Sequence, residues 1–508
     1  MNIRISRTSL FLILLFWGCS ETSPKTKEKG KFEANWESLR NYQTPEWFAD
    51  AKFGIFIHWG VYSVPEFESE WYPRLMYSNN GTYSAQGKLE KQGPSDVYKH
   101  HLKTYGALDK FGYKNFIPMF KAENFNPDQW MAIFKEAGAK YVISVADHHD
   151  GFAMYKSNTT RWNAVNMGPK RDVIGELKVA AKKFDLHFGV SSHYAFNWDF
   201  YPKKKGFDTV DPEYQDLYQK VHKPFIPADK VFLEKWWKRT TDLIDNYQPE
   251  ILWFDFCIDK PEFAPYHPKL AAYYYNKGID WGYDVILQTK NFNFESFPQG
   301  TDMLDIERGK LSDINKDVWQ TDTSIGKNSW GYVSNWISKS PDELIVDLVD
   351  IISKNGCLLL NIGPKKDGTI PQEQVDVLLK MGKWLKVNGE AVYGTRPWEK
   401  LGEGPTFVNA GYHSEGANKS FTSADLRFVT SKKGDLFVIV LEQPIDGKVL
   451  VTSLINHSKV NTKTVKSISL LGSTSAVKSN FTSEGLELQF DPKPNLKYAI
   501  AFKITLKD

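Results

Sequence analysis

The chain has 508 residues, of which 41% are hydrophobic, 25% charged and 15% aromatic. This length suits one large domain with a smaller companion, and the composition excludes a disordered or fibrous protein. The 64 basic and 61 acidic residues nearly cancel to a formal net charge of +3, and no basic stripe indicates a nucleic-acid partner.

The N-terminus is typical of a secretory signal. Two arginines precede the apolar run 10–17, which is too short to span a membrane as a stable helix. A small residue and Cys19 end this run, in a pattern similar to a bacterial lipoprotein cleavage site. We therefore expect a lipoprotein-type signal over residues 1–19, a lipid anchor on Cys19 and a flexible tether over residues 20–35. The protein would be exported across the inner membrane and be periplasmic or anchored in the outer membrane; ordinary secretion without a lipid is the alternative.

Residues 36–398 alternate short apolar runs with stretches of helical periodicity. This alternation predicts a parallel sheet covered by helices, and eight such units fit a (β/α)8 TIM-like barrel better than an open sheet. No G-x-G-x-x-G fingerprint follows the first run, which argues against a dinucleotide-binding fold. The predicted strands are Phe53–Ile57, Tyr141–Val145, Phe188–Val190, Ile251–Phe254, Val285–Leu287, Met303–Leu304, Val318–Trp319 and Leu358–Leu360. The predicted helices are Pro127–Ala137, Asp172–Lys183, Asp229–Asn246, Pro268–Lys277, Pro341–Lys354 and Gln372–Lys386.

The pattern changes after Trp398. Short β-type runs separated by turn residues follow, without a convincing helix, so that residues 399–508 predict an all-β sandwich domain. Within the barrel region, the stretch between Trp71 and Tyr113 is expected to be a long loop system that shapes a substrate mouth.

Reactive groups of a TIM barrel project from the C-terminal ends of its strands. Charged or imidazole side chains follow nearly every predicted strand, which is more than structure alone requires and describes an active site. In strand order they are His58, Asp147-His148-His149-Asp150, His193, Asp255, Lys290, Asp305 with Glu307, Asp322 and Asn361.

Carboxylates and histidines dominate this set, and no nucleophilic Ser or Cys with a matched base stands out. Hydrolysis of a glycosidic bond needs two carboxyl groups. Asp255 directly follows a buried strand and suits the nucleophile, with a helix cap or salt bridge as the structural alternative. Glu307 suits the proton donor, because a nearby ionised Asp255 would raise its pKa. Glu295 is the alternative donor, and a scaffold ion pair with Arg308 or Lys310 is the alternative role of Glu307.

His148 and His149 are the obvious candidates for a metal site. Adjacent residues on a strand point to opposite faces, however, and no H-x-H or H-E-x-x-H motif accompanies them. We expect both to bind sugar hydroxyls, with a purely structural role as the alternative, and we predict neither a metal nor a cofactor.

Five segments resemble signatures of the α-L-fucosidase family. Together they span roughly residues 36–398 and are collectively very specific. They are Phe53–Ser63, Glu70–Tyr72, His148–Phe152, Gly168–Asp172 and Ser353–Pro364.

The resemblance implies an exo-acting enzyme that removes terminal α-L-fucosyl residues from glycans with retention of configuration, by double displacement and without a cofactor. A barrel followed by a β-sandwich is that family's architecture. Asp255 falls on the family's nucleophile. The implied sugar-contacting residues are His58, Glu70, Trp71, His148, His149 and Trp253.

Three positions depart from the family pattern. Ala146 stands near the place of a common Lys before the paired histidines, His193 replaces a frequent Tyr, and Lys290 replaces an Arg. His193 and Lys290 are therefore also expected to bind the sugar, although the ammonium of Lys290 cannot form the paired hydrogen bonds of an Arg guanidinium. The family's proton donor varies in position, so the assignment of Glu307 as the donor has less support than that of Asp255 as the nucleophile.

Three other functions remain open on the sequence. One is a glycosidase of the same fold acting on a related sugar such as an α-L-galactoside, which differs only at C6. Another is a non-catalytic carbohydrate-binding lipoprotein, against which the presence of both Asp255 and Glu307 speaks. A metal-dependent barrel hydrolase is the third.

Overall fold

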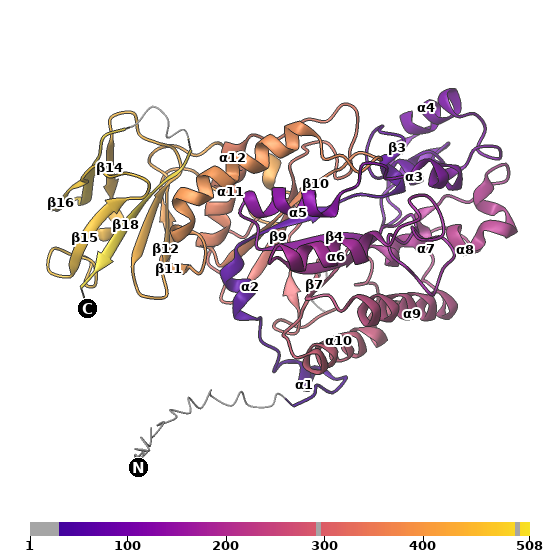
Figure 1. Ribbon diagram of the computed structural model, residues 1–508, viewed down its shortest axis with the longest axis horizontal. Coiled ribbons are helices and arrows are strands. Elements are labelled where there is room, and N and C mark those ends of the chain that lie inside the picture. Colours follow the sequence, from indigo (N-terminus) through magenta and orange to yellow (C-terminus); the bar gives the residue numbers. More distant parts are fainter. Residues whose placement is uncertain (1–29, 291–295, 493–497, 508) are drawn as a thin grey trace, which may run out of the picture.

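The computed structural model describes residues 30–290, 296–492 and 498–507. In this part of the chain, eight parallel strands form one sheet in the order β8-β7-β6-β5-β4-β1-β10-β9. A parallel bridge between Asp305 and Gln320 links its two edge strands, so the sheet closes into the expected barrel (Figure 1). The strands are β1 (Phe53–Ile57), β4 (Tyr141–Asp147), β5 (His187–Ser192), β6 (Ile251–Phe254), β7 (Ile286–Thr289), β8 (Met303–Leu304), β9 (Trp319–Ser324) and β10 (Gly356–Ile362).

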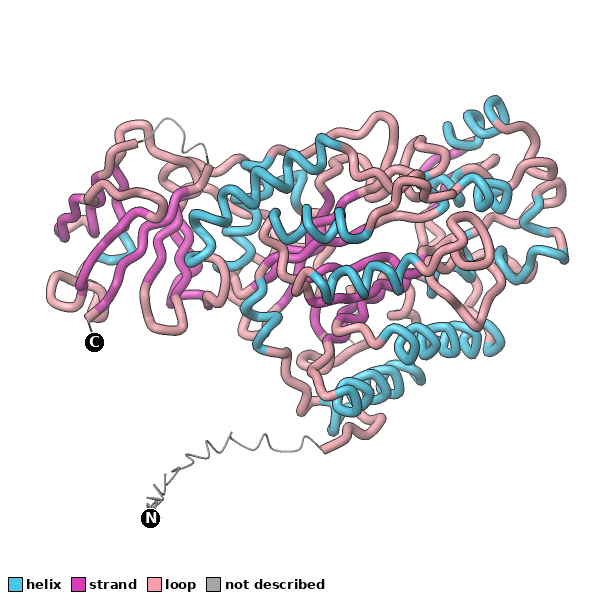
Figure 2. The backbone as a smooth tube through the Cα atoms, viewed as in Figure 1, coloured by secondary structure: helices cyan, strands magenta, loops and turns pink. Residues whose placement is uncertain are grey.

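Helices cover the outside of the barrel, so both faces of the central strands are buried. Every residue of β1, β4 and β10 is inaccessible to solvent or nearly so, which explains why these strands are mostly apolar along their length rather than alternating. The main barrel helices are α5 (Pro127–Glu136), α6 (Val173–Lys183), α9 (Lys230–Tyr247), α10 (His267–Trp281), α11 (Pro341–Ser353) and α12 (Gln372–Asn388) (Figure 2).

Side-chain caps fix where several of these helices begin. Asp172 accepts a hydrogen bond from the backbone of Gly175 at the start of α6, and Asp229 does the same for Phe232 at the start of α9. Ser340 and Glu343 form a reciprocal capping box on α11. Short helices connect the larger elements: α1 (Trp36–Leu39), α2 (Glu46–Ala51), α7 (Asn197–Phe200) and α8 (Gln215–Tyr218).

The stretch between Trp71 and Tyr113 is more ordered than a loop system. It contains α3 (Tyr72–Leu75), a hairpin of β2 (Gly81–Tyr83) and β3 (Leu89–Gln92), and α4 (Asp96–Thr104). Ser95 caps α4 by accepting from the backbone of Tyr98. The hairpin strands are polar and short, so their pattern carries no period-2 signal that the sequence could reveal.

A β-sandwich follows the barrel, as expected. One sheet has the order β11-β12-β13-β18-β15 and the other β14-β17-β16. The expected boundary at residue 398 lies inside β11, so the first strand of this domain begins two residues before it. The strands are β11 (Arg396–Glu403), β12 (Leu426–Thr430), β13 (Leu436–Val440), β14 (Lys448–Val451), β15 (Val465–Leu470), β16 (Lys478–Thr482), β17 (Gly485–Gln489) and β18 (Ile500–Leu506).

A buried charge network joins the two domains. Asp350 of α11 is fully buried, and its two carboxylate oxygens lie 2.7 Å from Nε of Arg427 on β12 and 2.8 Å from Nζ of Lys354. Lys310 Nζ lies 3.7 Å away. Burial alone would raise the pKa of Asp350, but Lys310, Lys354 and Arg427 outweigh it and hold that pKa well below its usual range.

The predicted signal over residues 1–19, with Cys19, lies outside the described residues, as does the tether up to residue 29. Asn35, near the end of that tether, caps α1 by accepting from the backbone of Ser38. Within the described ranges, no helix is both long and apolar enough to span a membrane.

Candidate active site

A polar pocket lies at the C-terminal ends of the barrel strands. It gathers the predicted catalytic and sugar-contacting residues that the structure describes, together with Asp322 from the strand-end set and two residues that the sequence did not single out, Phe256 and Trp330. Glu295, the alternative proton donor, lies outside the described residues. The polar pocket is lined by His58, Glu70, Trp71, His148, His149, His193, Trp253, Asp255, Phe256, Lys290, Glu307, Asp322 and Trp330.

Asp255 is the electrostatic centre of the polar pocket. It follows β6 directly, and only 5% of its surface is exposed. Its Oδ2 atom lies 3.1 Å from Nε2 of His149 and 3.1 Å from Nδ1 of His193, while Oδ1 lies 2.7 Å from Nζ of Lys290. Burial would raise the pKa of Asp255, but the Lys290 ammonium and the hydrogen bonds from the His149 and His193 imidazoles hold it well below its usual range. The carboxylate is therefore ionised and held in a fixed orientation.

Lys290 bridges the two predicted catalytic carboxylates. Its Nζ atom lies 2.7 Å from Asp255 Oδ1, 2.5 Å from Glu307 Oε2 and 3.9 Å from Asp322 Oδ2. Burial would lower the pKa of Lys290, but these three carboxylates raise it well above its usual range. The direct repulsion between Asp255 and Glu307 that the sequence suggested is thus replaced by an ammonium group between them. A sequence gives no sign of this, because the three side chains come from separate strands.

Hydrogen bonds fix the proton positions of two imidazoles. His58 Nδ1 donates to Asn361 Oδ1 over 2.7 Å, which leaves Nε2 as the acceptor. His193 Nδ1 faces Asp255, so the proton lies there and Nε2 accepts from the hydroxyl of Ser191 at 3.0 Å. Burial lowers the pKa of both imidazoles, and both are neutral.

His148 and His149 differ in their hydrogen bonds. His149 Nδ1 donates to the backbone oxygen of His193 at 2.7 Å and turns Nε2 toward Asp255. His148 Nδ1 is buried and has no hydrogen-bond partner among the described residues. Burial and the neighbouring imidazoles lower the pKa of His148 well below its usual range, so it is neutral. A buried polar nitrogen without a partner is costly, and a ligand hydroxyl would remove that cost.

Two groups in the polar pocket come close enough to hold a metal ion. The ligand atoms of His58, His148 and His193 lie within 4.8 Å of one another, as do those of His149, His193 and Asp255. Most of the nitrogens concerned are engaged in hydrogen bonds to Asn361, Ser191 and Asp255. The absence of a functional metal stays a prediction.

Glu70 supports the wall of the polar pocket. Its Oε2 atom accepts from Ser329 Oγ at 3.1 Å, from the backbone of Trp330 at 2.9 Å and from that of Gly331 at 3.3 Å. Glu70, predicted to contact sugar, therefore has a clear second task, which is to fix the loop that carries Trp330.

Aromatic rings form the other walls. Trp71 and Phe256 stack with ring centroids 6.2 Å apart, and Trp71 also packs against His149. Trp253 is fully buried and donates to Asp305 Oδ2 at 3.1 Å, with Lys290 over its ring. Phe256 lies one residue beyond Asp255, a position that could have identified it. Trp330 lies in a loop without periodicity, so no sequence signal marked it.

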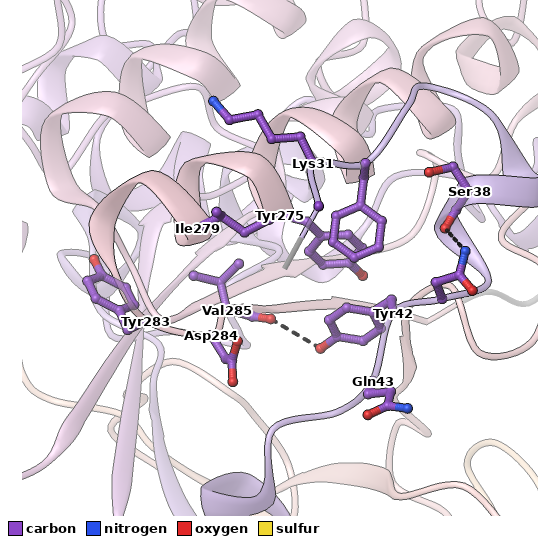
Figure 3. A pocket seen from close by; sticks show the side chains of 12 residues that line it. Lys31, Ser38, Tyr42, Gln43, Tyr275, Ile279, Tyr283, Asp284 and Val285 are labelled. Carbon is purple, nitrogen blue, oxygen red and sulfur yellow. Dashed lines mark hydrogen bonds between the residues drawn. The ribbon is translucent and has the colours of Figure 1, made fainter. Parts of the chain in front are cut away.

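A larger space, here called the N-terminal hollow, has a volume of about 460 Å³. It adjoins Val285, at the N-terminal end of β7, whereas Lys290 in the polar pocket follows the C-terminal end of the same strand. Figure 3 shows its walls, where the Tyr42 hydroxyl donates to the backbone oxygen of Val285 at 3.1 Å. Tyr42 and Tyr275 stack with centroids 4.2 Å apart.

Comparisons with known proteins identify the family of the chain. A sequence model of the α-L-fucosidase family matches residues 19–390. The human plasma α-L-fucosidase is 35% identical over 80% of this chain and 81% of its own length, and the human tissue α-L-fucosidase is 31% identical over 100% and 98%. The crystal structure of the Thermotoga maritima α-fucosidase in complex with fucose is 30% identical, with a TM-score of 0.72, over 94% of this chain and all of that one. The chain therefore belongs to the α-L-fucosidase family, a family of glycoside hydrolases.

Proposed function

We propose that this enzyme removes terminal α-L-fucosyl residues from glycans with retention of anomeric configuration. Asp255 is the nucleophile and Glu307 the acid/base in this proposal. The relatives named above, one of them solved with fucose, support the substrate class.

The separation of the two carboxylates carries the stereochemical part of the proposal. One nitrogen, Lys290 Nζ, contacts Asp255 Oδ1 at 2.7 Å and Glu307 Oε2 at 2.5 Å. The distance between these two carboxylate oxygens is therefore at most the sum of the two contacts. Retaining glycosidases place their carboxyl groups about 5 to 5.5 Å apart, whereas inverting ones need about 6.5 to 9.5 Å for a water molecule. The geometry therefore favours direct attack by Asp255.

In the first step, Asp255 forms a bond to the anomeric carbon of fucose while the bond to the leaving oxygen breaks. Glu307 gives its proton to that oxygen. For this transfer the leaving oxygen must lie beside Glu307 Oε2, the atom that Lys290 Nζ contacts at 2.5 Å. In the second step water gives a proton to the Glu307 carboxylate while its oxygen bonds to the anomeric carbon and the bond to Asp255 breaks, which frees the Asp255 carboxylate and restores the acid form of Glu307.

The neutral histidines suit the recognition of sugar hydroxyls. His58 Nε2 can only accept a hydrogen bond, because its Nδ1 proton is given to Asn361. The unpartnered Nδ1 of His148 offers a further site for a hydroxyl. The stacked rings of Trp71 and Phe256 give an apolar surface that suits the C–H face of a pyranose and its C6 methyl group.

The test is hydrolysis of an aryl α-L-fucoside followed by proton NMR. We expect α-L-fucose to form first and then to mutarotate. Initial release of β-L-fucose would contradict direct attack by Asp255. Faster hydrolysis of the matching α-L-galactoside would instead show that the polar pocket prefers a hydroxyl at C6.

We also propose that the enzyme works as a lipoprotein, periplasmic or held at the outer membrane through Cys19. The basic and apolar leader, the cleavage-like Gly18-Cys19 pair and the polar tether support this.

A further inference from the structure

The connection between β11 and β12 of the sandwich domain returns to the barrel beside the polar pocket. Its residues Gly411–Glu415, here called the clamp segment, lie against Glu307–Lys310 and include one antiparallel bridge, between Gly411 and Lys310. The backbone N–H groups of Gly411, His413 and Glu415 donate to the carbonyls of Lys310, Glu307 and Arg308 at 2.8, 2.8 and 3.0 Å. The clamp segment thus makes three backbone hydrogen bonds to the segment that carries the proposed acid/base.

Glu307 needs such support, because β8 is only two residues long and ends before it. On one edge, the backbone N–H of Arg308 donates to the oxygen of Asp322 on β9 at 2.8 Å. The clamp segment covers the other edge. The backbone around Glu307 is therefore held between the barrel and a segment from the second domain.

The clamp segment also contacts Lys290, which follows β7. The Tyr412 hydroxyl donates a hydrogen bond to the backbone oxygen of Lys290. Lys290 and Glu307 are the two residues that meet beside Asp255, so one pentapeptide bonds to the backbone of both.

Glu415 ties the clamp segment to the aromatic wall. Its carboxylate accepts from Arg308 Nη1, Lys339 Nζ and Thr323 Oγ1 at 2.7, 2.7 and 2.6 Å. Burial would raise the pKa of Glu415, but Lys339 and Arg308 lower it to about 2, so the group stays ionised. The Arg308 guanidinium in turn lies over the ring of Trp330, 4.7 Å from its centroid.

The approach of the two backbones is so close that only glycine fits at residue 309. A Cβ atom there would lie 1.9 Å from the backbone oxygen of Gly411. Arg308 and His413 both have a positive backbone φ, 43° and 56°, a conformation that residues other than glycine rarely adopt. Strain of this kind persists only where surrounding contacts impose it, and it gathers at functional sites.

We propose that the clamp segment is a positioning element that holds Glu307 and Lys290 in register with Asp255, with Tyr412 and Glu415 as its positioning residues. This inference rests on the proposed role of Glu307. A misplaced acid fails most where the leaving group is poor, because only a poor leaving group needs protonation.

The experiment is Glu415→Gln, assayed on a fucosyl disaccharide and on 2,4-dinitrophenyl α-L-fucoside. We expect kcat/KM on the disaccharide to fall by at least about tenfold, because small displacements of catalytic groups are costly. On the dinitrophenyl substrate the change should be under about twofold. Glu403→Gln is the matched control, since Glu403 accepts from Thr452 and Ser453 entirely within the sandwich domain. Equal losses on both substrates, or no loss on either, would overturn the inference.

Tyr412→Phe is the milder second variant and removes one hydroxyl without changing charge. It should show the same leaving-group dependence, with kcat affected more than KM. Glu307→Ala is run in parallel. If Glu307→Ala itself lacks the leaving-group signature, the proposed acid is wrong; if it has the signature and both clamp variants lack it, only the positioning role fails.

Discussion

The two ends of β7 open onto two very different spaces. The N-terminal hollow has a volume of about 460 Å³, whereas the polar pocket offers only about 40 Å³. In the hollow, Tyr42 and Tyr275 already give their hydroxyl protons to backbone oxygens, and the ion pair of Lys31 with Asp280 is exposed to solvent. In the polar pocket, buried Asp255 and Lys290 face each other directly. Concentrated, buried charge therefore marks the active site better than volume does.

The largest effect is expected when the buried carboxylate of Asp255 is removed from the polar pocket. Asp255→Ala should lower kcat by at least about a thousandfold, because the bond-forming group is gone. Added azide should restore part of the turnover and give a fucosyl azide of inverted configuration. Steady-state kinetics and product NMR measure both effects. Turnover close to wild type would refute the assignment of the nucleophile.

The cation of the polar pocket is the next target. Lys290→Met should lower kcat/KM by about a hundredfold, since a buried ion pair loses one partner. Lys290 holds the pKa of Asp255 down, so without it burial prevails and that pKa rises. The acid limb of the kcat/KM profile should therefore move to higher pH. Lys31→Met at the N-terminal hollow is the control, and it should leave the limb in place.

The histidines test whether hydrogen bonding or metal binding explains the polar pocket. His58→Ala and His148→Ala should each lower kcat/KM by about ten- to a hundredfold, through lost contacts to sugar hydroxyls. Prolonged treatment of the wild type with EDTA should change nothing. Stoichiometric metal in the active enzyme, lost together with activity, would assign these imidazoles to a metal instead.

A substitution in the N-terminal hollow should change stability and leave catalysis unaffected. Tyr42→Phe leaves the backbone oxygen of Val285 without its donor and should lower the free energy of unfolding by about 1 kcal/mol. Denaturant titration measures this loss, while kcat should stay unchanged. A tenfold fall in kcat would mean that the two ends of β7 are coupled.

The smallest kinetic effect is expected at Cys19. Cys19→Ser should release the enzyme from the membrane fraction, because the proposed lipid cannot be attached, yet leave specific activity unaltered. Fractionation of cells followed by assay of each fraction decides this. A mutant that still sediments with membranes would refute the lipid anchor.

The strands and helices of the barrel were predictable from sequence, because buried parallel strands are continuously apolar and the helices carry a clear period. Strand ends then placed Asp255, His58 and Lys290 at one face without any structure. The hairpin β2–β3 was missed, since exposed polar strands lack the alternation on which such predictions rest.

Other features of the site depend on contacts between distant parts of the chain. Lys290 meets Glu307 and Asp255 only because three strands converge. Glu70 binds the loop of Trp330, which lies 260 residues further along. The clamp segment comes from a domain that the sequence placed behind the barrel, and nothing local in Tyr412 or Glu415 indicates where it docks.

The buried network around Asp350 sets a limit on how this enzyme can be shortened. The family match ends at residue 390, which invites expression of the barrel alone. Such a truncation would remove Arg427, whose Nε lies 2.7 Å from Asp350, and leave a buried carboxylate with fewer counter-charges. Loss of one partner from a buried ion pair costs about 3 to 5 kcal/mol, a large share of the stability of a typical domain. We therefore expect the barrel and the sandwich to unfold as one cooperative unit, and the shortest stable catalytic fragment to extend well past the catalytic residues.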